Sequence, residues 1–96
     1  MYKVELSFDT DILNQASVEK MCAETDAIFE QEDLACTDRQ PGRRVYHDRG
    51  RKQDYGRFWA AIFALKKASW IAEHLKECFW YNGAEKENLI TEFLRN

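Results

Sequence analysis

The residues in this sequence that suggest chemistry most directly form a basic stretch from Arg39 to Arg57. This stretch carries seven basic residues against two acidic ones, a net charge of +5, whereas the rest of the chain carries seven against fifteen, a net charge of −8. Together the two parts give the net charge of −3 of the whole protein. The chain is therefore an acidic body with one basic segment, and such asymmetry bears on partner choice more than the total charge does.

One chemistry that suits the basic stretch is contact with phosphate. Guanidinium groups bind phosphate oxygens in pairs, tyrosine rings stack on unpaired bases, and glycines let a backbone approach a ligand closely. A nucleic-acid-binding accessory protein is therefore one hypothesis. Its contact residues would be Arg39, Arg43, Arg44, Tyr46, Arg49, Arg51, Lys52, Tyr55 and Arg57.

The overall charge favours a different role for the same residues. Nucleic-acid-binding domains are often basic, with a pI above about 9, whereas this chain has a pI near 5.4. The acidic partners available within the chain are Glu19, Glu24, Asp26, Glu30, Glu32 and Asp33. The basic stretch is thus expected to lie against an acidic face of the same chain or of a second copy, or to be solvated as a hairpin, in preference to binding a polyanion.

Aromatic residues point to an interface as well. Phe79, Trp80 and Tyr81 are consecutive, so they cannot all face one core from a helix, and Tyr, Trp and Arg carry much of the binding energy at protein interfaces. The alternative is that Trp80 is core, covered by the last helix. The leading hypothesis is a non-catalytic domain that contacts another protein or itself, with self-association expected. The expected partner-binding residues are Arg43, Arg44, Arg49, Arg51, Trp80 and Tyr81.

Catalytic and metal-binding patterns are weak. His74 and Cys78 are four residues apart, so on a helix they would touch and could form a base–thiol pair, but such neighbours are ordinary in any helix. Asp9 and Asp11 suit a helix cap better than a magnesium site. The sequence therefore predicts no enzyme, no cofactor and no metal.

Hydrophobic periodicity predicts the elements that position these residues. Tyr2–Asp9 alternates as a strand with one buried face, and Ser17–Glu32 has the period of an amphipathic helix. The segment Tyr55–Leu65 fits a buried strand or a buried helix, and a strand is preferred because Lys66 and Lys67 interrupt the helical pattern. The other predicted elements are strands over Leu34–Asp38 and Arg44–Asp48, a helix over Ala68–Tyr81 that ends at Asn82-Gly83, and a last helix from Ala84.

These elements predict a single α+β domain over residues 1–96, with a small antiparallel sheet and helices packed on one face. The predicted order is β-α-β-β-α-α. Its first five elements resemble the opening of a ferredoxin-like fold, with a C-terminal helix in place of the last strand.

Cysteine usage and hydropathy bear on location. The three cysteines, Cys22, Cys36 and Cys78, are widely spaced without a CxxC pair, which is typical of free thiols in a reducing compartment. The chain opens directly on a strand pattern rather than a signal peptide, and no apolar run approaches the roughly 20 residues of a membrane span. A cytoplasmic protein without a membrane partner is therefore expected.

Overall fold

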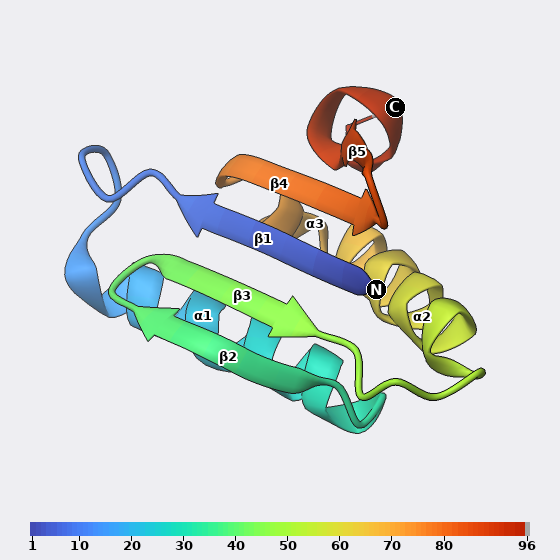
Figure 1. Ribbon diagram of the computed structural model, residues 1–96. Coiled ribbons are helices and arrows are strands. Elements are labelled where there is room, and N and C mark those ends of the chain that lie inside the picture. The colour runs from blue at the N-terminus through green and yellow to red at the C-terminus, as the bar shows by residue number, and fades with distance from the viewer. Residues whose placement is uncertain (96) are drawn as a thin grey trace.

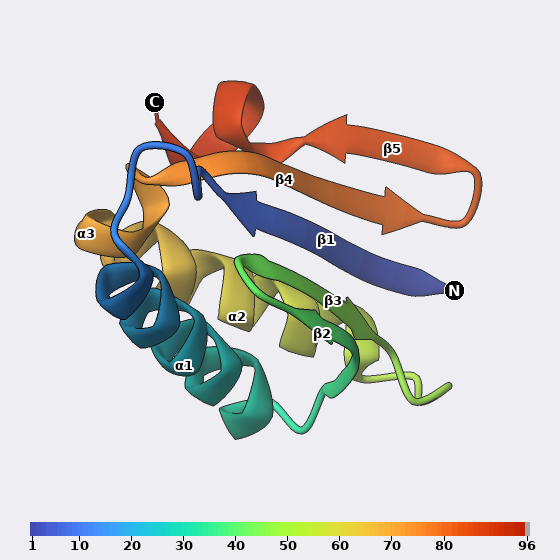
Figure 2. The ribbon, with the colours of Figure 1, turned by 90° about the vertical axis from the view of Figure 1, so that its left-hand side faces the viewer.

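A computed structural model describes residues 1–95 as one antiparallel sheet of five strands with helices on one face. In Figure 2 the two long helices lie together on the same side of the sheet. The elements in chain order are β1 (Tyr2–Phe8), α1 (Gln15–Gln31), β2 (Ala35–Gln40), β3 (Arg43–His47), α2 (Asp54–Lys67), α3 (Ser69–Ala72), β4 (Leu75–Asn82), β5 (Glu85–Asn88) and a π-helical turn η1 (Ile90–Leu94). The predicted α+β class, with helices on one face of an antiparallel sheet, is confirmed.

The sheet has the strand order β2-β3-β1-β4-β5, so β1 lies at its centre (Figure 1). Val4, Leu6 and Phe8 of β1 are buried, whereas Lys3 and Glu5 alternate with them on the uncovered face. The predicted alternation of the first strand is therefore confirmed. Because strand residues alternate between faces, the register with β3 and β4 also fixes which side chains of those strands meet the helices.

Helix α1 buries the apolar side predicted from its period, including Val18, Met21 and Phe29. It begins where the side-chain oxygen of Asn14 accepts a hydrogen bond from the backbone N–H of Ser17 at 2.8 Å, a standard N-cap contact. The β2–β3 hairpin that follows turns at Gly42, whose φ of 73° favours glycine. A Cβ at this position would also lie 2.5 Å from the side chain of Thr10.

Residues 55–65 are helical, so the preference for a strand there is wrong. Phe58, Ala61, Ile62 and Leu65 are fully buried at helical spacing within α2. The two lysines that argued against a helix belong to its last turn, where positive charge is favoured by the helix dipole. Lys66 also donates a hydrogen bond from Nζ to the carbonyl oxygen of Phe93 at 2.7 Å.

The predicted helix over residues 68–81 is wrong as well. Only the short helix α3 forms, and the chain then continues as β4, which pairs along its length with β1. Cys78 and Trp80 face the helices and are buried, whereas Phe79 and Tyr81 alternate onto the other face. Pairing with the central strand satisfies backbone groups that a helix would have satisfied internally, and so it overrides the helical spacing.

The C-terminal segment differs from the expected helix too. Gly83, at φ 61°, turns the chain between β4 and β5 and does not end a helix. Leu89 and Leu94 then anchor η1 on the core. The predicted β-α-β-β-α-α order, with a C-terminal helix replacing the last strand, is therefore wrong, because two further strands follow α2. In the described part of the chain, no helix is long and apolar enough to cross a membrane.

Candidate functional site

The arginines of the basic stretch are largely paired with carboxylates of the same chain. Arg44 of β3 faces α1, where its Nε donates to the carboxylate of Asp26 at 3.0 Å. The hydroxyl of Tyr46 donates to the same carboxylate at 2.6 Å, and the ring of Tyr46 stacks on Phe29 with centroids 4.0 Å apart. Burial, and then the bond to Asp26, raise the pKa of Tyr46. Tyr46 is thus a core residue and cannot stack on a base.

Two further arginines hold the loop between β3 and α2. The carboxylate of Asp54, which is fully buried, accepts hydrogen bonds from the backbone N–H groups of Arg49 and Arg51 and from Nε of Arg51 at 2.8 Å. Arg51 also donates to Asp33 at 2.6 Å. Burial alone would raise the pKa of Asp54, but the bonds from Arg51 and Arg49 hold it below its ordinary value of 3.8. These arginines therefore have a structural role.

The remaining residues of the basic stretch lie on different elements of the fold. Arg43 lies on the uncovered face of the sheet and pairs with Asp38 at 2.7 Å and Glu5 at 3.1 Å. Arg57 of α2 lies 3.8 Å from the carboxylate of Glu32. The more exposed members are Arg39, Lys52 and Tyr55. The structure thus does not gather the predicted nucleic-acid contacts into one surface.

The two aromatic residues predicted to bind a partner point to opposite faces of β4. Tyr81 lies on the uncovered face of the sheet, with Nζ of Lys3 above its ring at 4.3 Å. Trp80 faces the helices and is 5% exposed. It packs against Tyr2, Phe58 and Trp59. Residues of β1 and α2 therefore cover Trp80, in place of the predicted last helix.

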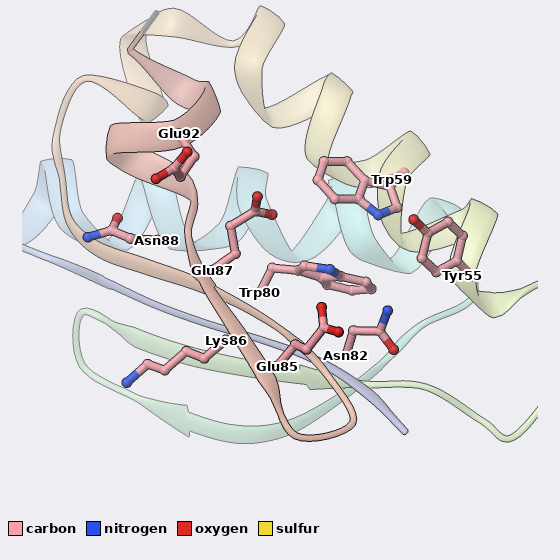
Figure 3. A pocket seen from close by; sticks show the side chains of 9 residues that line it. All are labelled: Tyr55, Trp59, Trp80, Asn82, Glu85, Lys86, Glu87, Asn88 and Glu92. Atoms are coloured by element: carbon pink, nitrogen blue, oxygen red, sulfur yellow. The ribbon is translucent and has the colours of Figure 1, made fainter.

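Beside Trp80 the structure has a hollow of about 580 Å³ between α2, β4, β5 and η1 (Figure 3). We call it the acidic–aromatic hollow, because it combines three aromatic rings with three carboxylates. It is lined by Tyr55, Trp59, Trp80, Asn82, Glu85, Lys86, Glu87, Asn88 and Glu92. The rings of Tyr55 and Trp59 lie about edge-on to Trp80, with centroids 6.0 and 5.6 Å from it. Rings and carboxylates thus share one concave surface.

The charge of this hollow is negative because its one basic residue points away. Strand alternation places Glu85 and Glu87 on the helix side of β5 and Lys86 on the other side. Nζ of Lys86 lies over the ring of Phe79 at 4.3 Å, and Figure 3 shows the ammonium directed out of the hollow. Within residues 1–95, the carboxylates of Glu85 and Glu87 have no hydrogen-bond or ion-pair partner.

A hydrogen-bond donor in the hollow is also unused. The indole Nε1 of Trp59 is buried, and it has no hydrogen-bond partner among the described residues. In Figure 3 it lies on the side of the ring that faces Trp80 and Tyr55. An unpaired buried donor costs about 1–3 kcal/mol, and because this nitrogen is shielded from solvent it is not directly open to a ligand in the hollow.

The carboxylates and rings of the hollow suit an organic cation better than a metal ion. In residues 1–95, no group of three or more His, Cys, Asp or Glu side chains is placed to hold a metal. An ammonium or guanidinium group, in contrast, is attracted both to carboxylates and to the faces of Trp and Tyr rings. His74 and Cys78 offer no alternative site. His74 follows α3, whereas Cys78 is in β4, where burial raises the pKa of its thiol to about 12.

Comparison of the chain with protein-family models, curated proteins and solved structures finds no match. The sequence patterns pointed to Trp80 and Tyr55 but not to Trp59, Glu85 and Glu87. The alternation of "EKEN" over residues 85–88 was the available signal, because on a strand it separates the glutamates from the lysine.

Proposed function

We propose that this protein is a non-catalytic domain that acts through protein–protein contacts, and that the acidic–aromatic hollow holds a basic segment of its partner. The proposal rests on one observation: the carboxylates of Glu85 and Glu87, which have no partner in the described chain, share one concavity with three aromatic rings. Trp and Tyr are the residues most enriched among those that dominate binding energy at interfaces.

The polar groups fit a peptide in particular. A lysine or arginine side chain would place its charge near the two glutamates and its apolar stem along the rings. The N–H of Trp59, which is unpaired within residues 1–95 and lies beside this position, would then report on the bound peptide through its NMR signal. Charge complementarity of this kind raises association rates and excludes acidic competitors. The arginines of the basic stretch support the proposal less, because most of them are paired with carboxylates of the same chain.

Nucleic-acid binding remains the alternative prediction, and the geometry gives it less support. Its stacking residue Tyr46 is 1% exposed, and Arg44 and Arg51 are paired with Asp26 and Asp54. The predicted cytoplasmic location remains a prediction.

The test is a titration with a short unstructured peptide that contains three arginines. Binding is monitored through the indole N–H signals of the protein in two-dimensional NMR. The signal of Trp59 should shift on binding, since its N–H faces the hollow. A peptide of the same length with citrulline in place of arginine should bind at least about tenfold more weakly, because the loss of one charge-assisted contact is worth roughly 1.4 kcal/mol or more.

Substitutions inside and outside the hollow test where the peptide binds. The double variant Glu85→Gln/Glu87→Gln should lose about tenfold or more in affinity, whereas Glu77→Gln, an exposed glutamate of β4 on the other face of the sheet, should bind as the unmodified protein does. Binding that leaves the Trp59 signal unmoved, or that is equal for both peptides, would overturn the proposal.

A further inference from the structure

Strand β5 forms the edge of the sheet beside the hollow, and no strand of the described chain lies beyond it. It pairs with β4 on one side only, and all four residues from Glu85 to Asn88 are exposed. In Figure 2 no other element lies along the outer edge of β5, because η1 begins only after the strand has ended. Such an edge offers backbone N–H and C=O groups to an extended segment of another chain.

The register of the β4–β5 hairpin identifies the residue whose backbone is available at this edge. The turn contains two residues, so Asn82 and Glu85 close it. In a turn of this length the N–H of the fourth residue donates to the carbonyl oxygen of the first. The backbone of Glu85, and by alternation that of Glu87, therefore faces β4. The N–H and C=O of Lys86 point outward, and within residues 1–95 no hydrogen bond from another element reaches them.

Side-chain charge alternates along β5 and is not neutralised on either face of the sheet. On the helix side, the carboxylates of Glu85 and Glu87 have no partner in the described chain. On the other side, Nζ of Lys86 lies 4.3 and 5.6 Å from the ring centroids of Phe79 and Tyr81, and it forms no salt bridge with a described residue. Figure 3 shows the two glutamates on one side of the strand and the lysine on the other. The edge thus presents the pattern negative, positive, negative.

We propose that the basic segment of the partner binds as an extended strand along the outer edge of β5, with the charge pattern positive, negative, positive. This inference rests on the function proposed for the hollow and specifies the partner segment. The central residue of the segment exchanges backbone hydrogen bonds with Lys86, and its carboxylate lies beside the ammonium of Lys86. The two flanking cations point to the other face, where they lie opposite Glu85 and Glu87. Because Trp80 is the β4 neighbour of Glu87, the cation opposite Glu87 lies closest to the rings.

Strand β5 of a second copy does not fit the same edge. Residues that pair across an antiparallel sheet point to the same face. Two copies of β5 can therefore pair only with glutamates opposite glutamates, whether Glu85 meets Glu87 or each meets itself. Like charges directly opposite each other are destabilising. The edge thus selects a segment with the opposite charge pattern.

The other edge of the sheet, β2, lacks these features. The register of β2 with β3 shifts between Cys36 and Asp38, and such an irregularity interrupts the regular spacing of the edge groups. The charges of β2 are also paired, since Asp38 lies 2.7 Å from Arg43 and Arg39 lies 3.6 Å from Asp26. Strand β5 is therefore the edge whose register is regular and whose charges lack counter-ions.

Peptides that differ only in the order of their residues test the charge pattern. One capped peptide has Arg-Glu-Arg between polar uncharged residues, and its control has Arg-Arg-Glu at the same place. The first should bind at least about tenfold more tightly at physiological salt, because only this order places both arginines opposite glutamates and the peptide glutamate beside Lys86. The preference for Arg-Glu-Arg over Arg-Lys-Arg should fall at least about tenfold in the variant Lys86→Glu.

Methylation of the peptide backbone tests the added strand itself. N-methylation of the central glutamate removes the N–H that donates to β5, and it should weaken binding at least about tenfold. N-methylation of the arginine that follows is the matched control, because the N–H of that residue points away from β5 and its loss should have a much smaller effect. The amide hydrogen of Lys86 should also exchange more slowly when the peptide is bound.

The outcomes separate this inference from the function proposed for the hollow. Equal affinity for the two peptide orders, equal effects of the two methylations, or an unprotected Lys86 amide would each overturn the added strand. An arginine-dependent shift of the Trp59 signal would still support the proposed function in that case. If no arginine peptide shifts the Trp59 signal, both proposals are overturned.

Discussion

The basic stretch and the acidic–aromatic hollow both concentrate charge, but they differ in where the opposite charge comes from. In the basic stretch, Arg44 and Arg51 meet Asp26 and Asp54 of the same chain at 3.0 Å and 2.7 Å. In the hollow, the basic lining residue Lys86 points to the other face of the sheet. A concentration of charge therefore marks a candidate binding site here only where the fold leaves it without its counter-ion.

The largest effect that would test this comparison is a loss of folding stability. Asp54→Asn removes the charge that holds the loop before α2, and it should lower the free energy of unfolding by about 3 kcal/mol, since it breaks a buried ion pair and its hydrogen bonds. Urea unfolding measures the change. Asp48→Asn is the control, because in the described chain the side chain of Asp48 makes no hydrogen bond or ion pair. A loss no larger than that of the control would contradict the structural role of Arg49 and Arg51.

Acid should weaken the same network gradually. The pKa of Asp33 is lowered by the hydrogen bond from Arg51 and the charge of Arg49, and the pKa of Asp54 is also below 3.8 in the folded protein. Since a lowered folded-state pKa stabilises the fold when the group is ionised, this contribution is complete well above pH 3.8 and is lost as the pH falls below it.

The measurement is the free energy of unfolding of the unmodified protein and of Asp54→Asn between pH 7 and pH 2.5. The difference in unfolding free energy between them should be constant above about pH 5 and should shrink below about pH 4. Protonation of Asp54 then removes from the unmodified protein the negative charge that the variant already lacks. A difference that grows on acidification would show that the sign of the shift is wrong.

The smallest effect is expected for nucleic acid. Because most arginines of the basic stretch are paired internally, labelled single-stranded and double-stranded DNA and RNA should bind weakly, with a salt dependence that corresponds to at most about two released counter-ions. Fluorescence anisotropy at several salt concentrations measures this slope, with Arg39→Ala/Lys52→Ala as the variant that removes the most exposed cations. A steep slope that falls by about one for each removed cation would favour the nucleic-acid hypothesis.

Several features could be predicted because they depend on local sequence. The alternation in Tyr2–Phe8 and the period of Val18, Met21 and Phe29 each specify an element through side chains that are close in sequence. The charge asymmetry between residues 39–57 and the rest of the chain was also visible. These patterns predicted the first four elements and the side of α1 that is buried.

The second half of the chain could not be assigned in this way. Residues 55–65 are apolar on nearly every side, so period alone did not separate helix from strand. Residues 74–81 have helical spacing, but they form β4 because the open edge of β1 offers backbone hydrogen bonds over seven residue pairs. Whether Trp80 was core or interface depended on the same choice, since a strand points it at α2 and its neighbours Phe79 and Tyr81 the other way.

The α+β class, the excess of cations between Arg39 and Arg57, and the presence of enough carboxylates to neutralise them can be read from the amino-acid sequence. Which charges meet depends on the packing of helices against the sheet, because Asp26 and Arg44, or Asp33 and Arg51, are 18 residues apart and come together only in the folded chain. The same packing turns Lys86 away from Glu85 and Glu87. Charges adjacent in sequence separate on a strand, and charges far apart in sequence pair across the fold.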